Sequence, residues 1–225
     1  MKELPEIVEA EQVVKNATAN GVLQISDEER DQHAHRLLDA EHGSAIFENG
    51  KIKKINGAED FSGPVRQERK ALVIIGYPAA GKSSVFANSL SYENKARIVD
   101  SDVVKEWLDG FDGGFGAGYV QDMSAKIAER ALDIAVQNGD NIVLPRIGGK
   151  SVMIMSAALR AMGYDVQLYL NDVVPSTSYM RSSSRFAMTG RYLSLDYLTT
   201  IGDYPSKTFS NFAEETIGDY INECS

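Results

Sequence analysis

Residues 71–84 read Ala-Leu-Val-Ile-Ile-Gly-Tyr-Pro-Ala-Ala-Gly-Lys-Ser-Ser, and they carry the strongest structural signal in the chain. The apolar run ends at Gly76 and is typical of a parallel strand that is buried on both faces. Residues 76–83 then match the pattern G-x-x-x-x-G-K-S. The glycines of this pattern let the backbone turn tightly and direct successive N–H groups inward, toward an anion. The stretch therefore predicts a phosphate-binding loop between a buried strand and a helix, whose positive N-terminal end faces the same anion.

Individual residues of this loop have expected roles in holding a nucleotide. Lys82 is aimed at the β- and γ-phosphates, and the Ser83 hydroxyl is a ligand for Mg²⁺. A chance match is the alternative, because glycine, lysine and serine are common residues. The strand before the loop and the helical pattern after it favour a real phosphate site. The predicted nucleotide-binding residues are Gly76, Tyr77, Pro78, Ala79, Ala80, Gly81, Lys82, Ser83 and Ser84.

Composition and charge limit the kind of protein. The chain has 225 residues, of which 43% are hydrophobic and 24% are charged, as in ordinary soluble globular proteins. Its net charge of −9 argues against non-specific nucleic-acid binding, which needs clustered lysine and arginine. The longest aliphatic run, residues 71–75, is too short to span a bilayer. The single cysteine, Cys224, fits a reducing compartment, so we expect a cytoplasmic protein with no membrane partner.

The chain divides into three predicted parts. Residues 1–43 form an acidic helical extension, residues 44–70 a hairpin and connector, and residues 71–225 the phosphate-loop domain. Two helices are expected in the first part, one over residues 4–18 and one that begins with the capping box of Ser26 and Glu29. Acidic residues dominate the first part, which is typical of a solvated helical surface. The turn residues Glu48-Asn49-Gly50 predict the hairpin.

Strand and helix patterns alternate from residue 71 onward. Strands are predicted near residues 72, 97, 142 and 167, each followed by a helix, and this order is typical of a parallel α/β sheet flanked by helices. The fold class is therefore that of a P-loop NTPase, in which ligands bind at the carboxyl ends of the strands. After the fourth strand we expect a helix from Pro175, a break at Gly190, and short helices to the end of the chain.

Two carboxylates follow the second predicted strand, at Asp100 and Asp102. A carboxylate in this position can hold Mg²⁺ or can deprotonate the hydroxyl of an acceptor. The alternative for Asp102 is that it only caps the next helix. The predicted metal-binding residues are Ser83, Asp100 and Asp102, and Asp102 is the predicted catalytic base.

Three arginines follow the fourth predicted strand, at positions 181, 185 and 191. Arg181 and Arg185 are four residues apart and so lie on one helix face. Phosphoryl transfer needs positive charge around the γ-phosphate, so Lys82, Arg185 and Arg191 join Asp102 as predicted catalytic residues. An amphipathic surface helix is the alternative. Lys105 and Arg146 either reach the same crevice or are surface charges.

A glycine-rich loop is predicted over residues 109–118. It either closes over a substrate, with Phe111 or Phe115 stacking on it, or is a flexible connection. The sequence does not decide between these alternatives.

Taken together, these motifs resemble the zeta-toxin family of P-loop kinases. The resemblance covers about residues 71–198. It rests on the phosphate loop, on Ile98-Val99-Asp100-Ser101-Asp102-Val103-Val104-Lys105, on residues 139–144 and on Gly163-Tyr164. It also rests on an arginine-bearing lid, the segment after the fourth strand that contains Arg181, Arg185 and Arg191. It implies a small-molecule kinase that uses ATP or GTP with Mg²⁺, and UDP-N-acetylglucosamine is the family's best-known acceptor. Asp102 matches the family's catalytic base, Lys82 and Ser83 match its phosphate and Mg²⁺ groups, and Arg185 and Arg191 match its lid arginines.

The sequence departs from that family at two points. The family's toxins usually carry a Glu-Gly-Thr run after the third strand, where this chain has Pro145-Arg146-Ile147, and the lid arginines lie closer together here. Because of both departures, the resemblance does not identify the acceptor. A nucleotide-binding regulatory or interaction module without phosphoryl transfer is the alternative function.

The resemblance also implies a protein partner. Zeta toxins are typically silenced by a helical antitoxin that blocks the nucleotide site. We expect either such an antitoxin or inhibition in cis by the acidic N-terminal segment, residues 1–41.

Overall fold

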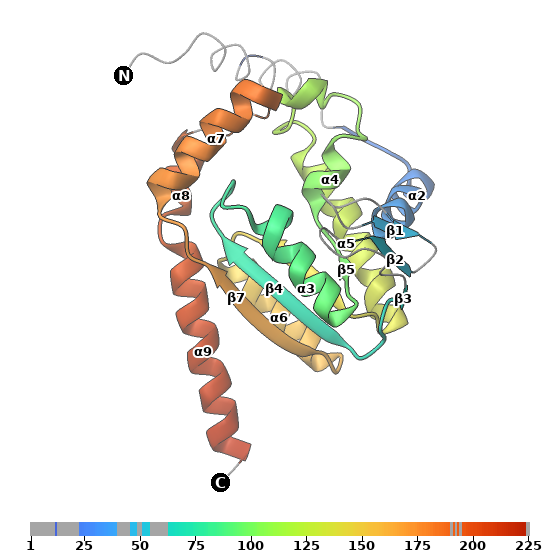
Figure 1. Ribbon diagram of the computed structural model, residues 1–225, viewed down its shortest axis with the longest axis vertical. Helices are drawn as coiled ribbons and strands as arrows, with labels where there is room; N and C mark the ends of the chain where they lie inside the picture. Colours follow the sequence, from blue (N-terminus) through green and yellow to red (C-terminus); the bar gives the residue numbers. More distant parts are fainter. Residues whose placement is uncertain are drawn as a thin grey trace.

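A computed structural model describes residues 12, 23–39, 46–48, 51–54, 63–189, 191, 193 and 195–223. Its centre is a parallel sheet with strand order β5-β6-β4-β7 (Figure 1). The strands are β4 (Lys70–Gly76), β5 (Arg97–Ile98), β6 (Ile142–Arg146) and β7 (Asp165–Asn171). This arrangement confirms the predicted α/β fold class, and β4 lies between two neighbours, as its continuous apolar sequence requires.

Successive residues of β4 are buried on opposite faces of the sheet. Val73 and Ile75 belong to the larger hydrophobic cluster, which includes residues of α5 (Gln121–Asn138) and α6 (Lys150–Ala161). Leu72 and Ile74 belong to a second cluster with α3 (Ala87–Asn94). All four side chains are fully buried. Because side chains alternate along a strand, one apolar run supplies both halves of the core.

Three helices complete the C-terminal part: α7 (Pro175–Thr189), α8 (Leu195–Ile201) and α9 (Tyr204–Glu223). The expectation of only short helices after Gly190 is wrong, because α9 has 20 residues. Pro205 lies in the first turn of α9, where a missing N–H breaks no intrahelical hydrogen bond. Phe212, one of the buried residues of α9, packs into the larger core cluster.

The predicted capping box and hairpin are both present. Helix α2 (Asp27–Leu38) begins after Ser26, whose Oγ accepts from Glu29 N at 3.2 Å, while Ser26 N donates to Glu29 Oε2 at 2.8 Å. Strands β1 (Ile46–Glu48) and β2 (Lys51–Lys54) pair antiparallel, and β3 (Gly63–Pro64) pairs with β2. The helix predicted over residues 4–18 lies outside the described residues apart from Gln12.

Helix α2 is part of the main core and not a solvated extension. Ala34 and Leu37 are fully buried, and Leu38 is 5% exposed, in the cluster that also contains residues of α5. The buried Arg97 links this helix to the sheet, because its NH1 donates to Leu38 O at 2.7 Å and its Nε donates to Asp140 at 2.7 Å. The proposed boundaries at residues 43 and 70 stay predictions.

Replacing Leu37 with alanine is expected to lower the free energy of unfolding by about 2–5 kcal/mol, because the change leaves a cavity in a closed part of the core. Urea denaturation of the wild-type and variant proteins measures the difference. Gln32→Ala is the matched control, since Gln32 is exposed on the same helix. Equal stability of the Leu37 and Gln32 variants would contradict the placement of α2 in the core.

Within the described residues, no helix has the length and apolar character needed to cross a bilayer.

Candidate active site

The phosphate loop has the backbone geometry that its sequence requires. A Cβ on Gly76 would lie 2.7 Å from the backbone oxygen of Asn171, so only glycine fits beside the end of β7. Gly81 has a φ of +90° and caps η1 (Lys82–Phe86), a π-helical turn that leads into α3. Left-handed φ values favour glycine because glycine has no Cβ that could clash with the backbone. The predicted strand, loop and helix are thus confirmed in their order. The Ser84 side chain lies outside the described residues.

The Lys82 ammonium is folded back onto the start of its own loop. Its Nζ donates to Gly76 O at 2.8 Å and to Tyr77 O at 2.7 Å. Burial lowers the pKa of Lys82 to about 8, although Asp100 and Asp102 act in the opposite direction. An anion at the loop would stabilise the charged form of Lys82 and compete with these two carbonyl groups.

The two predicted carboxylates lie beside the loop at the end of β5. Ser83 Oγ donates to Asp100 Oδ2 at 2.5 Å, and Asp100 Oδ1 accepts from Asp102 N at 3.0 Å. Asp100 is therefore the N-cap of α4 (Ser101–Lys105). The alternative in which Asp102 caps this helix is wrong, and its carboxylate remains available for other contacts.

Two cations hold the Asp102 carboxylate. Lys105 Nζ lies 2.8 Å from Asp102 Oδ1, and Arg191 NH2 lies 3.0 Å from Asp102 Oδ2. Burial would raise the pKa of Asp102, but Lys105 and Arg191 outweigh it and lower the pKa to about 2. The carboxylate is therefore ionised at neutral pH. The sequence left the role of Lys105 open, and the structure shows that this residue contacts Asp102.

The arginines of the lid divide into two groups. Arg181 NH1 donates to Ala80 O of the phosphate loop at 3.1 Å. Arg191 reaches Asp102, and Arg185 lies close enough for Arg191 to lower its pKa, an effect that adds to that of burial. The structure thus places Arg191 in contact with the Asp102 carboxylate and Arg185 near it, while Arg181 contacts the loop.

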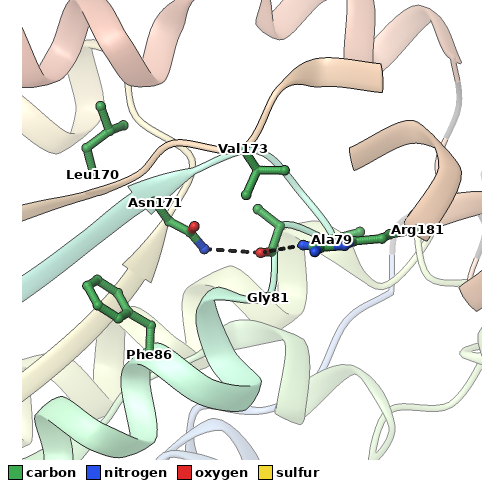
Figure 2. Close-up of a pocket in the computed structure, with 8 residues that line it drawn as sticks. Ala79, Gly81, Phe86, Leu170, Asn171, Val173 and Arg181 are labelled. Carbon is green, nitrogen blue, oxygen red and sulfur yellow. Dashed lines mark hydrogen bonds between the residues drawn. The ribbon is translucent and has the colours of Figure 1, made fainter. Parts of the chain in front are cut away.

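The sequence patterns did not indicate several of the residues that hold the phosphate loop in place. Asn171 Nδ2 donates to Ala80 O at 3.1 Å (Figure 2), and Ser178 of α7 donates a hydrogen bond to Pro78 O. The Tyr77 hydroxyl donates to Gly202 O, between α8 and α9. The position of Asn171 at the end of a buried strand is a usable signal, because ligands bind at strand ends. A serine within a polar helix such as α7 gives no comparable signal.

A cavity of about 670 Å³ lies beside the loop, between the end of β7 and α7 (Figure 2). It combines apolar side chains with an arginine and an amide. The lining residues are Ala79, Ala80, Gly81, Phe86, Leu170, Asn171, Val173 and Arg181. Apolar walls with a few polar groups are typical of small-molecule sites.

The glycine-rich loop packs against the lid. Phe115 makes an edge-to-face contact with Phe186 of α7, with ring centroids 5.7 Å apart, and Phe111 packs against the main core. A Cβ on Gly116 would lie 1.7 Å from Gly110 O, so the loop backbone is closely packed on itself. These contacts argue against a loose connection, and closure of the loop over a substrate stays a prediction.

The oxygen ligands present fit Mg²⁺. The Ser83 hydroxyl and the Asp100 carboxylate already lie within hydrogen-bond distance of each other. Among the described residues, no group of three or more His, Cys, Asp or Glu side chains forms a closed metal cage. Mg²⁺ does not need one, since it is bound through one or two protein oxygens together with phosphates and waters.

Comparison with known structures supports the same fold. A structure from the PezAT chromosomal toxin–antitoxin system of Streptococcus pneumoniae is 16% identical, covers 79% of this chain and 72% of its own, and gives a TM-score of 0.54. The AvrRxo1-ORF1:AvrRxo1-ORF2 complex with sulphate ions is 14% identical, covers 96% of this chain and 61% of its own, and gives a TM-score of 0.55. The same complex has been solved with ATP, at a TM-score of 0.54. A search of curated proteins finds no match.

The sequence itself matches the family model described as "Zeta toxin" over residues 57–222. This match spans well over half of the chain, and it includes the phosphate loop, the Asp100–Asp102 strand end and Arg191. The chain therefore belongs to the zeta-toxin family of P-loop kinases.

Proposed function

We propose that this protein is a kinase that transfers the γ-phosphoryl group of ATP or GTP to a hydroxyl of a small molecule. The observation that carries the proposal is the meeting of Ser83, Asp100 and Asp102 at one end of the sheet, linked by contacts of 2.5 and 3.0 Å. Lys82 and Arg191 bring positive charge to the same place. Phosphoryl transfer relies on this combination of positioning and electrostatic stabilisation.

The donor half uses the loop and the cavity beside it. Backbone N–H groups of the phosphate loop bind the phosphates, and Lys82 moves from the carbonyl groups of Gly76 and Tyr77 to the β- and γ-phosphates. Ser83 and Asp100 would hold Mg²⁺, which neutralises charge on the transferred group. The apolar walls of the cavity suit the nucleobase. The related complex that was solved with ATP supports a nucleotide at this fold.

The acceptor half is built around Asp102. Its ionised carboxylate accepts the hydrogen bond of the acceptor hydroxyl and takes the proton as the new oxygen–phosphorus bond forms and the bond to the leaving diphosphate breaks. Arg185 and Arg191 stabilise the charge that spreads over the γ-phosphoryl oxygens. Because ATP and GTP are cytoplasmic substrates, the proposal places the reaction in the cytoplasm.

A panel of hydroxyl-bearing metabolites, scored for ADP release, tests the proposal. UDP-N-acetylglucosamine is the first acceptor to include, because the resemblance to zeta toxins implies it. Acceptor-dependent ADP release and a phosphorylated product are expected. Nucleotide binding without any acceptor-dependent release would instead support a regulatory module, and absence of nucleotide binding would contradict the donor site itself.

Nucleotide affinity is expected to fall as the pH rises above about 8. The pKa of Lys82 is lowered to about 8, so the lysine loses its proton, and its attraction for phosphate, from that pH upward. Bound phosphate stabilises the charged lysine and shifts the loss to somewhat higher pH. Calorimetric titration with a non-hydrolysable ATP analogue from pH 7 to 10 measures the effect. In Lys82→Met this decline should vanish, and a decline of the same size in the variant would rule out Lys82 as its source.

A protein inhibitor of the antitoxin kind is part of the proposal. The PezAT structure, which comes from a toxin–antitoxin system, supports it. Inhibition in cis is the alternative, but it is confined to the segment before α2, because α2 belongs to the core. Removal of residues 1–22 tests this alternative, with tighter nucleotide binding as the result in its favour. Removal of residues 1–41 would also delete α2 with the buried Leu37, so its effect would include damage to the core.

A further inference from the structure

Arg146 is a partly buried arginine at the carboxyl end of β6, in register with Ile75 of the phosphate-loop strand. Its NH1 donates to Val99 O at 3.2 Å and to Pro145 O at 2.8 Å. Val99 follows β5, which lies on the opposite side of β6 from β4. The guanidinium therefore lies toward the strand end that carries Asp100 and Asp102.

Among the residues that the structure describes, none forms an ion pair with Arg146. Within the described part of the chain, no carboxylate lies within 4.0 Å of this guanidinium, and Asp100 and Glu129 act on it only from a longer range. The buried Arg97 differs, because Asp140 contacts it at 2.7 Å and Asp39 at 3.4 Å. Burial lowers the pKa of Arg146, which is the cost of holding this charge away from water. A bound anion would offset that cost.

The remaining donors of Arg146 suit a planar anionic group. Both of its hydrogen bonds to described residues use NH1, so the edge formed by Nε and NH2 is the one that can face a ligand. This edge matches a phosphate or a carboxylate in two-pronged geometry. By contrast, the neighbouring cations Lys105 and Arg191 both contact Asp102.

We propose that Arg146 binds an anionic group of the acceptor, a phosphate or a carboxylate, while Asp102 receives the hydroxyl of the same molecule. This inference rests on the proposed kinase function. It makes Arg146 a specificity-determining residue, and it defines the acceptors as small molecules that carry both a hydroxyl and an anionic group. The contact of the guanidinium with Val99 O, beside the strand end that carries Asp102, favours the acceptor over the γ-phosphate of the donor as its ligand.

Matched pairs of compounds test this proposal. The pairs are N-acetylglucosamine with its 1-phosphate, ribose with ribose 5-phosphate, and glucose with glucuronate. Binding is measured by calorimetry with Mg²⁺ and a non-hydrolysable ATP analogue present, and turnover by ADP release with ATP. At least one charged member is expected to bind more tightly than its neutral partner. The phosphate pairs and the carboxylate pair show which anion the site takes.

Replacing Arg146 with methionine is expected to raise the acceptor Kd by about 10- to 100-fold, the usual effect of losing hydrogen bonds to a charged group. Arg146→Lys keeps the charge and loses the planar fork, so its acceptor Kd should lie between those of the wild-type protein and the methionine variant. Arg66→Met is the matched control, since Arg66 is exposed and pairs with Glu68. Thermal unfolding of each variant shows whether it is folded.

The outcomes separate this proposal from the function on which it rests. Equal binding of the charged and neutral members by the wild-type protein overturns the role of Arg146, and this comparison needs no variant. A Met variant that weakens ATP and leaves the acceptor unchanged also overturns it, because the arginine would then serve the donor. Failure of the wild-type protein to bind ATP contradicts the kinase function itself.

Discussion

Replacing Asp102 with asparagine is expected to lower kcat for acceptor-dependent ADP release by about 10²–10⁴-fold, the usual contribution of a general base. The amide keeps the shape of the side chain but cannot take a proton from the acceptor hydroxyl. Nucleotide affinity should persist, because the loop and Lys82 hold the phosphates and Asp102 faces Lys105 and Arg191 instead. Initial-rate kinetics and calorimetric titration with a non-hydrolysable ATP analogue measure the two quantities separately.

Two further variants make this test specific. Asp122→Asn, at an exposed position of α5, controls for the loss of one negative charge. Asp100→Asn should instead raise the Mg²⁺ concentration that the reaction needs, because Asp100 is a proposed Mg²⁺ ligand. Its Oδ2 accepts the hydrogen bond of Ser83, the other proposed ligand. Unchanged turnover in Asp102→Asn would remove this residue from the mechanism, and a shifted Mg²⁺ requirement would reassign it as a metal ligand.

The fold was predictable because its main signals are local. The apolar run at residues 71–75 indicates a strand buried on both faces, and each of its central residues is fully buried in the structure. The glycines at 76 and 81 indicate turns that only glycine accommodates, and a Cβ clash and a left-handed φ are found there. Such patterns depend on neighbours in sequence, so they can be read without knowing the tertiary contacts.

The parts that could not be predicted depend on residues far apart in sequence. Helix α2 has few apolar residues, and its burial depends on a surface of α5 about 90 residues later. The contact between Asp102 and Arg191 depends in the same way on where the lid folds. Pro145-Arg146 reads only as a departure from the family's pattern. The structure suggests a role for Arg146, because its guanidinium contacts Val99 O, beside the carboxylates.

Replacing Arg191 with methionine is expected to lower kcat by about 10³-fold or more, the contribution that an arginine makes to stabilising a transferred phosphoryl group. Arg191 also contacts Asp102 and helps to keep the pKa of that carboxyl low. Removal of the arginine therefore raises the pKa of Asp102 from about 2. The expected result is a slower enzyme whose activity falls off at a higher pH on the acid side than that of the wild-type protein.

The acid side of the pH–rate profile separates the two tasks of Arg191 when it is compared with Arg185→Met. Arg185 acts on Asp102 more weakly than Arg191 does, and it forms no ion pair with that carboxylate within 4.0 Å among the described residues. Loss of Arg185 should therefore slow the reaction with little shift of the acid limb. A shift of equal size in both variants would mean that Arg191 acts only through the general field of the site. A slow Arg191 variant with no shift would assign this arginine to the phosphoryl group alone, because its contact with Asp102 would then be broken in the working complex.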